Sequence, residues 1–257
     1  MLGGDVAESF KRDLRTAIEV HRGAQKIIAD TFGISVPSLY RVLGECGLKD
    51  LMRESRRRRP MQHRVLTPDR NTGSNDFTGA FQPESQRYAE HFRHRGETVT
   101  VSTVPLSSSR HNMRESVKRL LASGTAPLDT LVLMCHGWPD GIQLGFHRDD
   151  CASLAEMIAA YCVESPLVVL YCCSCGSDSN GGAGNSFAGV LRDRCRALGR
   201  SATVFAHTTA GHTTRNPNIR VFHGSDERWT DVNAPRDQME DRLNPYRWDL
   251  PRSLVLP

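Results

Sequence analysis

The sequence contains no apolar run of the roughly 18 to 20 residues that a membrane-spanning helix requires. Its first eleven residues lack the basic start and apolar stretch of a secretory signal peptide, since they include Asp5 and Glu8. Cysteine is also sparse: the 257 residues include 8, far below the density of a secreted disulfide scaffold. With 39% hydrophobic and 24% charged residues, the composition is globular and not that of a disordered chain. We therefore expect a soluble, cytoplasmic protein with reduced thiols and no membrane partner.

The net charge of +4 is small, but it is unevenly distributed. Residues 1–64 hold 13 Lys and Arg against 8 Asp and Glu, whereas residues 65–257 hold 20 against 21. The densest basic run consists of Arg56, Arg57, Arg58 and Arg59. Four adjacent guanidinium groups would repel one another on a helix, which favours a solvated linker or a contact with phosphate. We therefore expect a domain boundary at this run.

The segment from residue 23 to residue 47 has the pattern of two short helices joined by a tight turn. Ile28 and Phe32 belong to one apolar stripe, Leu39 and Leu43 belong to another, and Gly33 between them can take a positive φ. This spacing resembles the helix-turn-helix of resolvases and small bacterial regulators, whose second helix enters the major groove. The resemblance implies double-stranded DNA as a partner. The residues it places against DNA are Ser35, Val36, Ser38, Tyr40 and Arg41, with Arg56, Arg57, Arg58 and Arg59 as a clamp on the DNA backbone. The alternative is a three-helix bundle that docks another protein.

From His63 onward, apolar segments alternate with amphipathic helical ones. The expected strands are residues 63–67, 98–104, 130–135, 167–173, 202–206 and 219–222. The expected helices are residues 83–95, 110–123, 151–162 and 186–198. This alternation predicts an α/β fold with a mainly parallel central sheet of about six strands and helices on both faces. Residues 131–134 and 167–170 are continuously apolar, so we expect their strands at the centre of the sheet.

A histidine and a cysteine follow these two central strands. His136 and Gly137 come directly after the first, and Cys175 comes after the second. Because ligands bind beyond the carboxyl ends of parallel strands, we expect these residues to meet in one crevice. A thiol gains nucleophilicity from a neighbouring imidazole, and the N–H groups of Gly137 and Cys175 can serve as donors to an oxyanion.

These residues resemble the motifs of the caspase-like cysteine peptidases, a class that includes caspases, metacaspases and gingipains. The matching pieces are His136-Gly137 after one apolar strand, Asp140-Gly141-Ile142 a few residues later, and Ser174-Cys175-Gly176 after a second apolar strand. The resemblance implies a three-layer α/β/α fold preceded by the small all-α helix-turn-helix domain. It also implies peptide-bond hydrolysis through an acyl-enzyme thioester, with His136 as general base, Cys175 as nucleophile, and Gly137 and Cys175 as the oxyanion hole. That chemistry needs no cofactor and no metal, and its partner is a protein or peptide substrate.

The sequence departs from the family pattern near the nucleophile. Two residues before Cys175, where many relatives carry Asp or Gln, this chain has Cys173, which we expect to form a wall of the substrate pocket. A neutral cysteine cannot pair with Lys or Arg, so we expect no specificity for basic residues. Polar side chains after the fifth strand complete the expected pocket: His207, His212 and Arg215, the last suited to an acidic group. The alternative for this segment is a polar connecting loop.

Three other functions compete with the peptidase. Cys135, His136 and the cysteines at 172, 173 and 175 have the chemistry of a zinc site, but adjacent cysteines on a strand point to opposite faces. An α/β-hydrolase would use a Cys172-x-Ser174-x-Gly176 elbow, but too few residues follow it for the remaining strands of that fold. A DNA-binding regulator with a catalytically inactive caspase-like domain is the third. The expected organisation is a helix-turn-helix domain at 1–55, a basic linker at 56–62, a peptidase domain at 63–225 and an irregular arm at 226–257.

Overall fold

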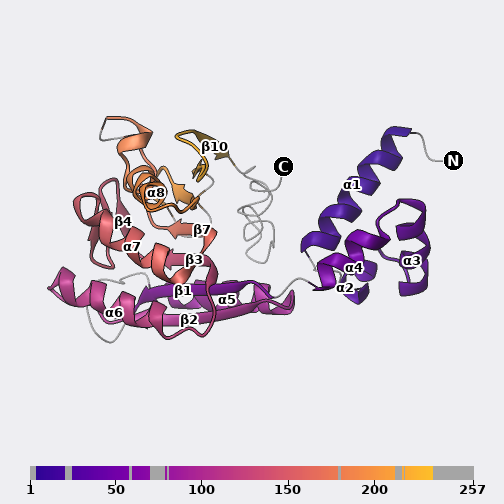
Figure 1. Ribbon diagram of the computed structural model, residues 1–257, viewed down its shortest axis with the longest axis horizontal. Helices are drawn as coiled ribbons and strands as arrows, with labels where there is room; N and C mark the ends of the chain where they lie inside the picture. Colours follow the sequence, from indigo (N-terminus) through magenta and orange to yellow (C-terminus); the bar gives the residue numbers. More distant parts are fainter. Residues whose placement is uncertain are drawn as a thin grey trace. The chain divides into compact units, whose positions relative to one another are not determined.

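The computed structural model describes residues 4–20, 25–57, 60–69, 79, 81–178, 181–211, 216 and 218–233. The chain divides into two compact units, one at Met1–Pro60 with Phe92–Glu97 and the other at Met61–His91 with Thr98–Pro257. The described part of the smaller unit is helical, and the larger unit is α/β (Figure 1). Within the described ranges, no helix combines the length and the apolar character that crossing a membrane needs.

The described residues of the smaller unit form four helices: α1 (Gly4–Val20), α2 (Gln25–Thr31), α3 (Val36–Glu45) and α4 (Lys49–Arg57). Gly33 ends α2 at a φ of 62°, and the Ser35 hydroxyl caps α3 by accepting a hydrogen bond from the Ser38 N–H. The turn between α2 and α3 thus forms as the sequence predicts. The core of the unit consists of Leu14, Ala17, Ile18, Ile28, Ala29, Leu39, Leu43, Leu48 and Met52.

Helix α4 overturns the expected start of the linker. Arg56 and Arg57 are the last residues of this helix, whereas the sequence placed both in a linker. Leu48 and Met52 pack at helical spacing into the core, and their burial stabilises the helix. Arg58 and Arg59 lie outside the described residues.

A seven-stranded sheet forms the centre of the larger unit, in the order β10-β9-β8-β7-β3-β1-β2 (Figure 1). The strands are β1 (Gln62–Pro68), β2 (Thr98–Val104), β3 (Leu128–Met134), β7 (Cys162–Tyr171), β8 (Thr203–His207), β9 (Asn218–Phe222) and β10 (Trp229–Asn233). The first five in chain order run parallel, and β9 and β10 add an antiparallel edge. The mainly parallel sheet is therefore confirmed, with β3 and β7 at neighbouring central positions.

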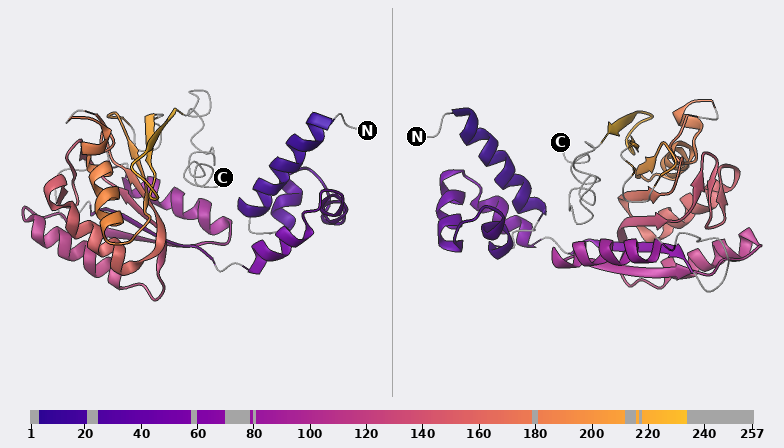
Figure 2. Two further views of the ribbon diagram at one scale, coloured as in Figure 1. Left: turned by 45° about the horizontal axis from the view of Figure 1, so that its top comes forward. Right: turned by 180° about the vertical axis from the view of Figure 1, so that it is seen from behind.

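Helices cover both faces of this sheet (Figure 2). They are α5 (Phe81–His94), α6 (Arg110–Ala122), α7 (Cys151–Tyr161) and α8 (Phe187–Ala197). Helices α6, α7 and α8 share one apolar core with Leu66 of β1 and Leu133 of β3. Helix α5 packs on the other face, where the Tyr88 hydroxyl lies 2.9 Å from Nδ1 of His63. His63 and Leu66 point to opposite faces because side chains alternate along β1.

Two further segments were not predicted. A three-stranded hairpin sheet follows β3 and consists of β4 (Gly137–Trp138), β5 (Gly141–Ile142) and β6 (Phe146–His147). Strand β10 lies within the expected irregular arm, so that expectation is wrong for residues 229–233. The sequence WTDVN gives little apolar signal, because an edge strand pairs on one side and buries less surface. The rest of the arm, from residue 234, lies outside the described residues.

Candidate active site

The register between β3 and β7 decides which residues meet at the carboxyl end of the sheet. Met134 pairs with Tyr171, and one position further the Sγ atoms of Cys135 and Cys172 are 3.4 Å apart. The same register therefore brings His136 level with Cys173, on neighbouring strands that lie ~4.8 Å apart. Cys135 and Cys172 belong to the core beneath α6, α7 and α8, so strand alternation predicts the opposite, α5 face for their successors.

His136 lies on the α5 face. Its ring meets the ring of Phe81 edge to face, with centroids 4.9 Å apart and planes at 86°. Its backbone is fixed by Gln143, whose N–H donates to the His136 carbonyl at 2.9 Å and whose Oε1 accepts from the His136 N–H at 3.3 Å. Among the residues that the structure describes, none forms a hydrogen bond with the imidazole.

Cys175 lies on the other face. A methyl group placed on Gly137 would come within 2.6 Å of the Cys175 Sγ, so the thiol fills the space that a side chain at position 137 would occupy. The Cys175 side chain is 0% exposed and its Sγ donates to the Gly141 carbonyl at 3.6 Å. Burial raises the pKa of Cys175 above that of a free thiol. These observations describe a packing thiol and weigh against the expected nucleophile.

Cys173 is the more accessible thiol. It is half-buried, and its Sγ donates to the Gly211 carbonyl at 3.4 Å. Ser174, the next residue, has a φ of 57° and is the only non-glycine with positive φ in the described part of the chain. Such a conformation costs about 1–2 kcal/mol in an L-residue and turns the chain sharply. The structure therefore leaves Cys173 half-buried just after the carboxyl end of β7, whereas Cys175 is fully buried.

The N–H group of Gly137 is the expected hydrogen-bond donor to an oxyanion, and the β4–β5 hairpin determines its direction. In the β4–β5 hairpin, His136 and Gln143 form a hydrogen-bonded pair, so the next pair, Gly137 and Ile142, is a non-hydrogen-bonded one. The Gly137 N–H therefore points away from β5. A methyl group on Gly137 would also lie 3.0 Å from the Cys173 carbonyl oxygen, so the two backbones are in contact. Glycine is required here by this close approach.

The expected substrate pocket is only partly visible. His207 is the last residue of β8 and is 3% exposed, so it does not belong to an open loop as the sequence suggested. Its ring lies 5.9 Å from that of Tyr171, and burial lowers its pKa to about 4. Its Nδ1 has no hydrogen-bond partner among the residues that the structure describes. His212 and Arg215 lie outside the described residues.

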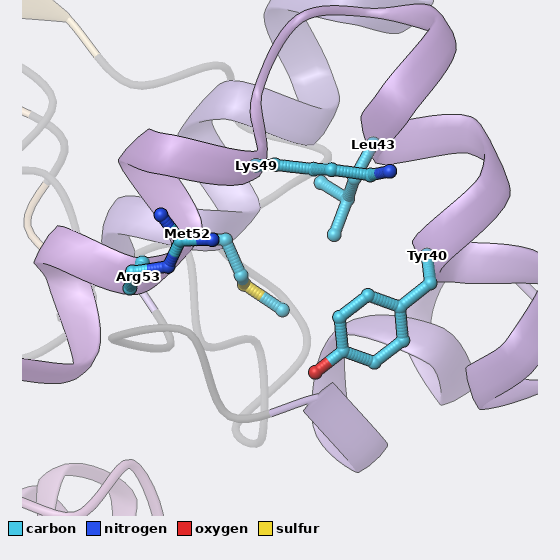
Figure 3. A pocket seen from close by; sticks show the side chains of 5 residues that line it. All are labelled: Tyr40, Leu43, Lys49, Met52 and Arg53. Carbon is cyan, nitrogen blue, oxygen red and sulfur yellow. The ribbon is translucent and has the colours of Figure 1, made fainter.

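The expected DNA-facing residues line α3 in the smaller unit. Ser35 is its cap, Ser38 is half-buried in its first turn, and Tyr40 and Arg41 are exposed further along. A hollow of about 200 Å³ lies beside α3 (Figure 3), and it is lined by Tyr40, Leu43, Lys49, Met52 and Arg53. The Lys49 chain extends over Gly44, where an added methyl group would lie 3.0 Å from its Nζ. Tyr40 is 41% exposed at the rim.

The described residues contain no group of three His, Cys, Asp or Glu side chains arranged to hold a metal ion. The sequence reasoning also missed a buried arginine, Arg220, that contacts the turn after Cys173. The sequence feature that could have indicated Arg220 is a single charged residue among the apolar residues of β9. No protein-family model matches the chain, and no curated protein matches it.

Proposed function

We propose that the larger unit is a cysteine peptidase of the caspase-like kind, with His136 as general base and Cys173 as nucleophile. The observation that carries this proposal is the β3–β7 register, which brings the chain at His136 and the chain at Cys173 to the carboxyl ends of two neighbouring strands. Cys173 replaces Cys175 in this role because Cys175 is fully buried on the opposite face. The sheet with a parallel body and an antiparallel edge is compatible with the fold that the resemblance implies.

The proposed reaction runs in two steps. His136 accepts the thiol proton while the Cys173 sulfur attacks the peptide carbonyl carbon, and the resulting oxyanion accepts a hydrogen bond from the Gly137 N–H. The intermediate collapses to a thioester when the C–N bond breaks and His136 gives the proton to the leaving amine. Water, deprotonated by His136, then cleaves the thioester and releases the acid.

Probe labelling tests the nucleophile. A peptide with an activated ketone should label Cys173, as mapped by mass spectrometry, and Cys173→Ala and His136→Ala should each lower turnover of a peptide library at least about 10³-fold. Cys175→Ala is the matched control and should retain turnover within a few-fold. Loss of labelling and turnover in Cys175→Ala alone would return the role to Cys175. Wild-type protein that neither reacts nor cleaves would favour the inactive regulator instead.

We also propose that the smaller unit binds double-stranded DNA through α3. This is supported by the exposed Tyr40 and Arg41 on a capped helix whose other face, Leu39 and Leu43, is buried. The basic excess of the first quarter of the chain provides the charge that a phosphate backbone attracts. A docking bundle for another protein is the alternative.

Salt dependence separates these two partners. Fluorescence anisotropy with a labelled duplex should show an affinity that falls steeply with salt, and Arg41→Ala should reduce the slope of log K against log salt by about 0.9 if Arg41 contacts one phosphate. Arg12→Ala removes a cation from α1 and should change the slope less. A flat salt response would support protein docking.

A further inference from the structure

One buried guanidinium group contacts the turn that follows Cys173. The side chain of Arg220, in β9, donates through Nη1 to the Gly176 carbonyl at 3.1 Å. Nη1 also hydrogen-bonds to Oδ1 of Asp178, and Nη2 lies 3.4 Å from its Oδ2. Both Gly176 and Asp178 belong to the turn that follows Cys173. Arg220 therefore binds this turn twice, through a carbonyl and a carboxylate.

The other side of the same guanidinium binds β10. Nη2 of Arg220 donates to Oδ2 of Asp231 at 2.8 Å, and Nε donates to Oδ1. The Arg220 side chain is 7% exposed, whereas those of Asp178 and Asp231 are 62% and 53% exposed. The two carboxylates thus hold a buried cation from opposite sides, and the hydrogen bonds raise the pKa of Arg220 and lower that of Asp231.

Small residues make this contact possible. Arg220 pairs with Ala206 of β8 on one side and with Asp231 of β10 on the other. Gly176 packs over Ala206: a methyl group added to Gly176 would lie 3.2 Å from the Cβ of Ala206. A larger residue at 176 or 206 would fill the path by which the guanidinium reaches across β8.

Backbone hydrogen bonds hold the remaining parts of the turn. The Ser174 N–H donates to the Thr209 carbonyl at 3.2 Å, and the Gly176 N–H donates to the His207 carbonyl at 2.9 Å. These bonds join the turn to the end of β8. The Asp178 carbonyl accepts a hydrogen bond from the Gly182 N–H at 3.2 Å, but the Asp178 carboxylate is held by Arg220. In the described residues, Arg220 is the only cation that contacts the Asp178 carboxylate.

We infer that Arg220, acting through Gly176 and Asp178, is a positioning residue that fixes the turn after Cys173 and so sets the position of its thiol relative to His136. This inference rests on the proposed peptidase function of that pair. The positioning role explains why a charged side chain lies within the buried strand β9. It also gives a reason for the left-handed conformation of Ser174, which the turn held by Arg220 must keep. Asp231 completes the charge pairing without touching the turn.

The two carboxylates provide a matched pair of variants. Asp178→Asn and Asp231→Asn are isosteric changes of exposed residues that each remove one charge from the same arginine. Asp178→Asn should lower kcat about tenfold or more at similar KM, because a displaced nucleophile loses alignment. It should also slow alkylation of Cys173 by iodoacetamide and alter the pH profile of that alkylation. Asp231→Asn should change turnover and the alkylation rate of Cys173 by less than about threefold, even if it lowers the melting temperature as much as Asp178→Asn does. Asp178→Glu should retain more turnover than Asp178→Asn.

Equal effects of the two variants on turnover and alkylation would overturn the inference, because Arg220 would then act only on stability. An Asp178→Asn variant with wild-type alkylation of Cys173 would overturn it as well. The alkylation measurement keeps this test separate from the proposed function. If wild-type protein cleaves no peptide but Cys173 alkylation responds to Asp178→Asn alone, the peptidase proposal fails and the positioning role stands. If Cys173→Ala abolishes cleavage but the two Asn variants behave alike, the peptidase proposal stands and the positioning role of Arg220 fails.

Discussion

Replacing Gly137 by alanine tests the closest backbone approach in the candidate active site. The added methyl group would lie 2.6 Å from the Cβ of Cys172, 2.6 Å from the Sγ of Cys175 and 3.0 Å from the Cys173 carbonyl oxygen. Favourable contacts between carbon atoms lie at about 3.5–4.0 Å, so two of these contacts are too short by roughly 1 Å. Neither partner is the end of a long side chain, so the strand ends of β3 and β7 must separate.

The expected cost follows from this overlap. Overpacking of a buried site destabilises a protein by about 1–3 kcal/mol, and each kcal/mol lowers the melting temperature of a domain of this size by about 2–4 °C. Gly137→Ala should therefore lower the melting temperature by about 2–12 °C. A movement of about 1 Å between His136 and Cys173 should lower peptide turnover by about 100-fold.

Calorimetry and urea unfolding measure this effect, with Gly184→Ala as the control. No atom lies within 4 Å of a methyl group on Gly184, so that variant should stay within about 0.5 kcal/mol of wild type. In the double variant with Cys175→Ala, one of the three short contacts disappears. The double variant should therefore lose less unfolding free energy than the sum of the losses of the two single variants. A Gly137→Ala protein with wild-type stability, or strictly additive losses, would refute the proposed contact between Gly137 and Cys175.

Three further changes test other parts of the larger unit. Arg192 is 1% exposed and donates to the carbonyls of residues 223, 226, 227 and 228, so Arg192→Met should cost about 3 kcal/mol or more in urea unfolding; an unchanged midpoint would contradict this. Burial lowers the pKa of His207 from 6.5 to about 4, so the folded state binds fewer protons than the unfolded state and stability is lost as the pH falls through that window. The loss of stability between these two pH values should be about 3 kcal/mol, and His207→Leu should abolish this pH dependence. A His207→Leu variant with the wild-type pH dependence would contradict the role of His207. Ser174→Gly should be more stable than Ser174→Val by over about 1 kcal/mol in thermal unfolding, since valine resists a φ of 57°, and the opposite order would contradict the turn.

Much of the sheet was readable from the sequence because its central strands are buried on both faces. Continuous apolar runs mark β3 and β7, and β2, an edge strand with exposed residues, also has the predicted limits, residues 98–104. Helix α4 and strand β10 were missed for opposite reasons. The run of arginines concealed a helix whose stability comes from Leu48 and Met52, and β10 is an edge strand with a polar sequence. Both elements depend on packing against distant parts of the chain.

The sequence by itself determined the alternation of strands and helices, the histidine after β3, the group of thiols after β7 and the turn between α2 and α3. These features depend on local periodicity and on residues with special backbone preferences, which are encoded over a few positions. Only the tertiary structure distinguished the thiols, because the face on which each one lies depends on the β3–β7 register and on the turn at Ser174. In a regular strand, residues two apart share a face, so spacing alone could not separate Cys173 from Cys175; the turn at Ser174 breaks that pattern. Arg220 likewise acquired a role only when β9 and β10 brought it to the turn beside Cys173.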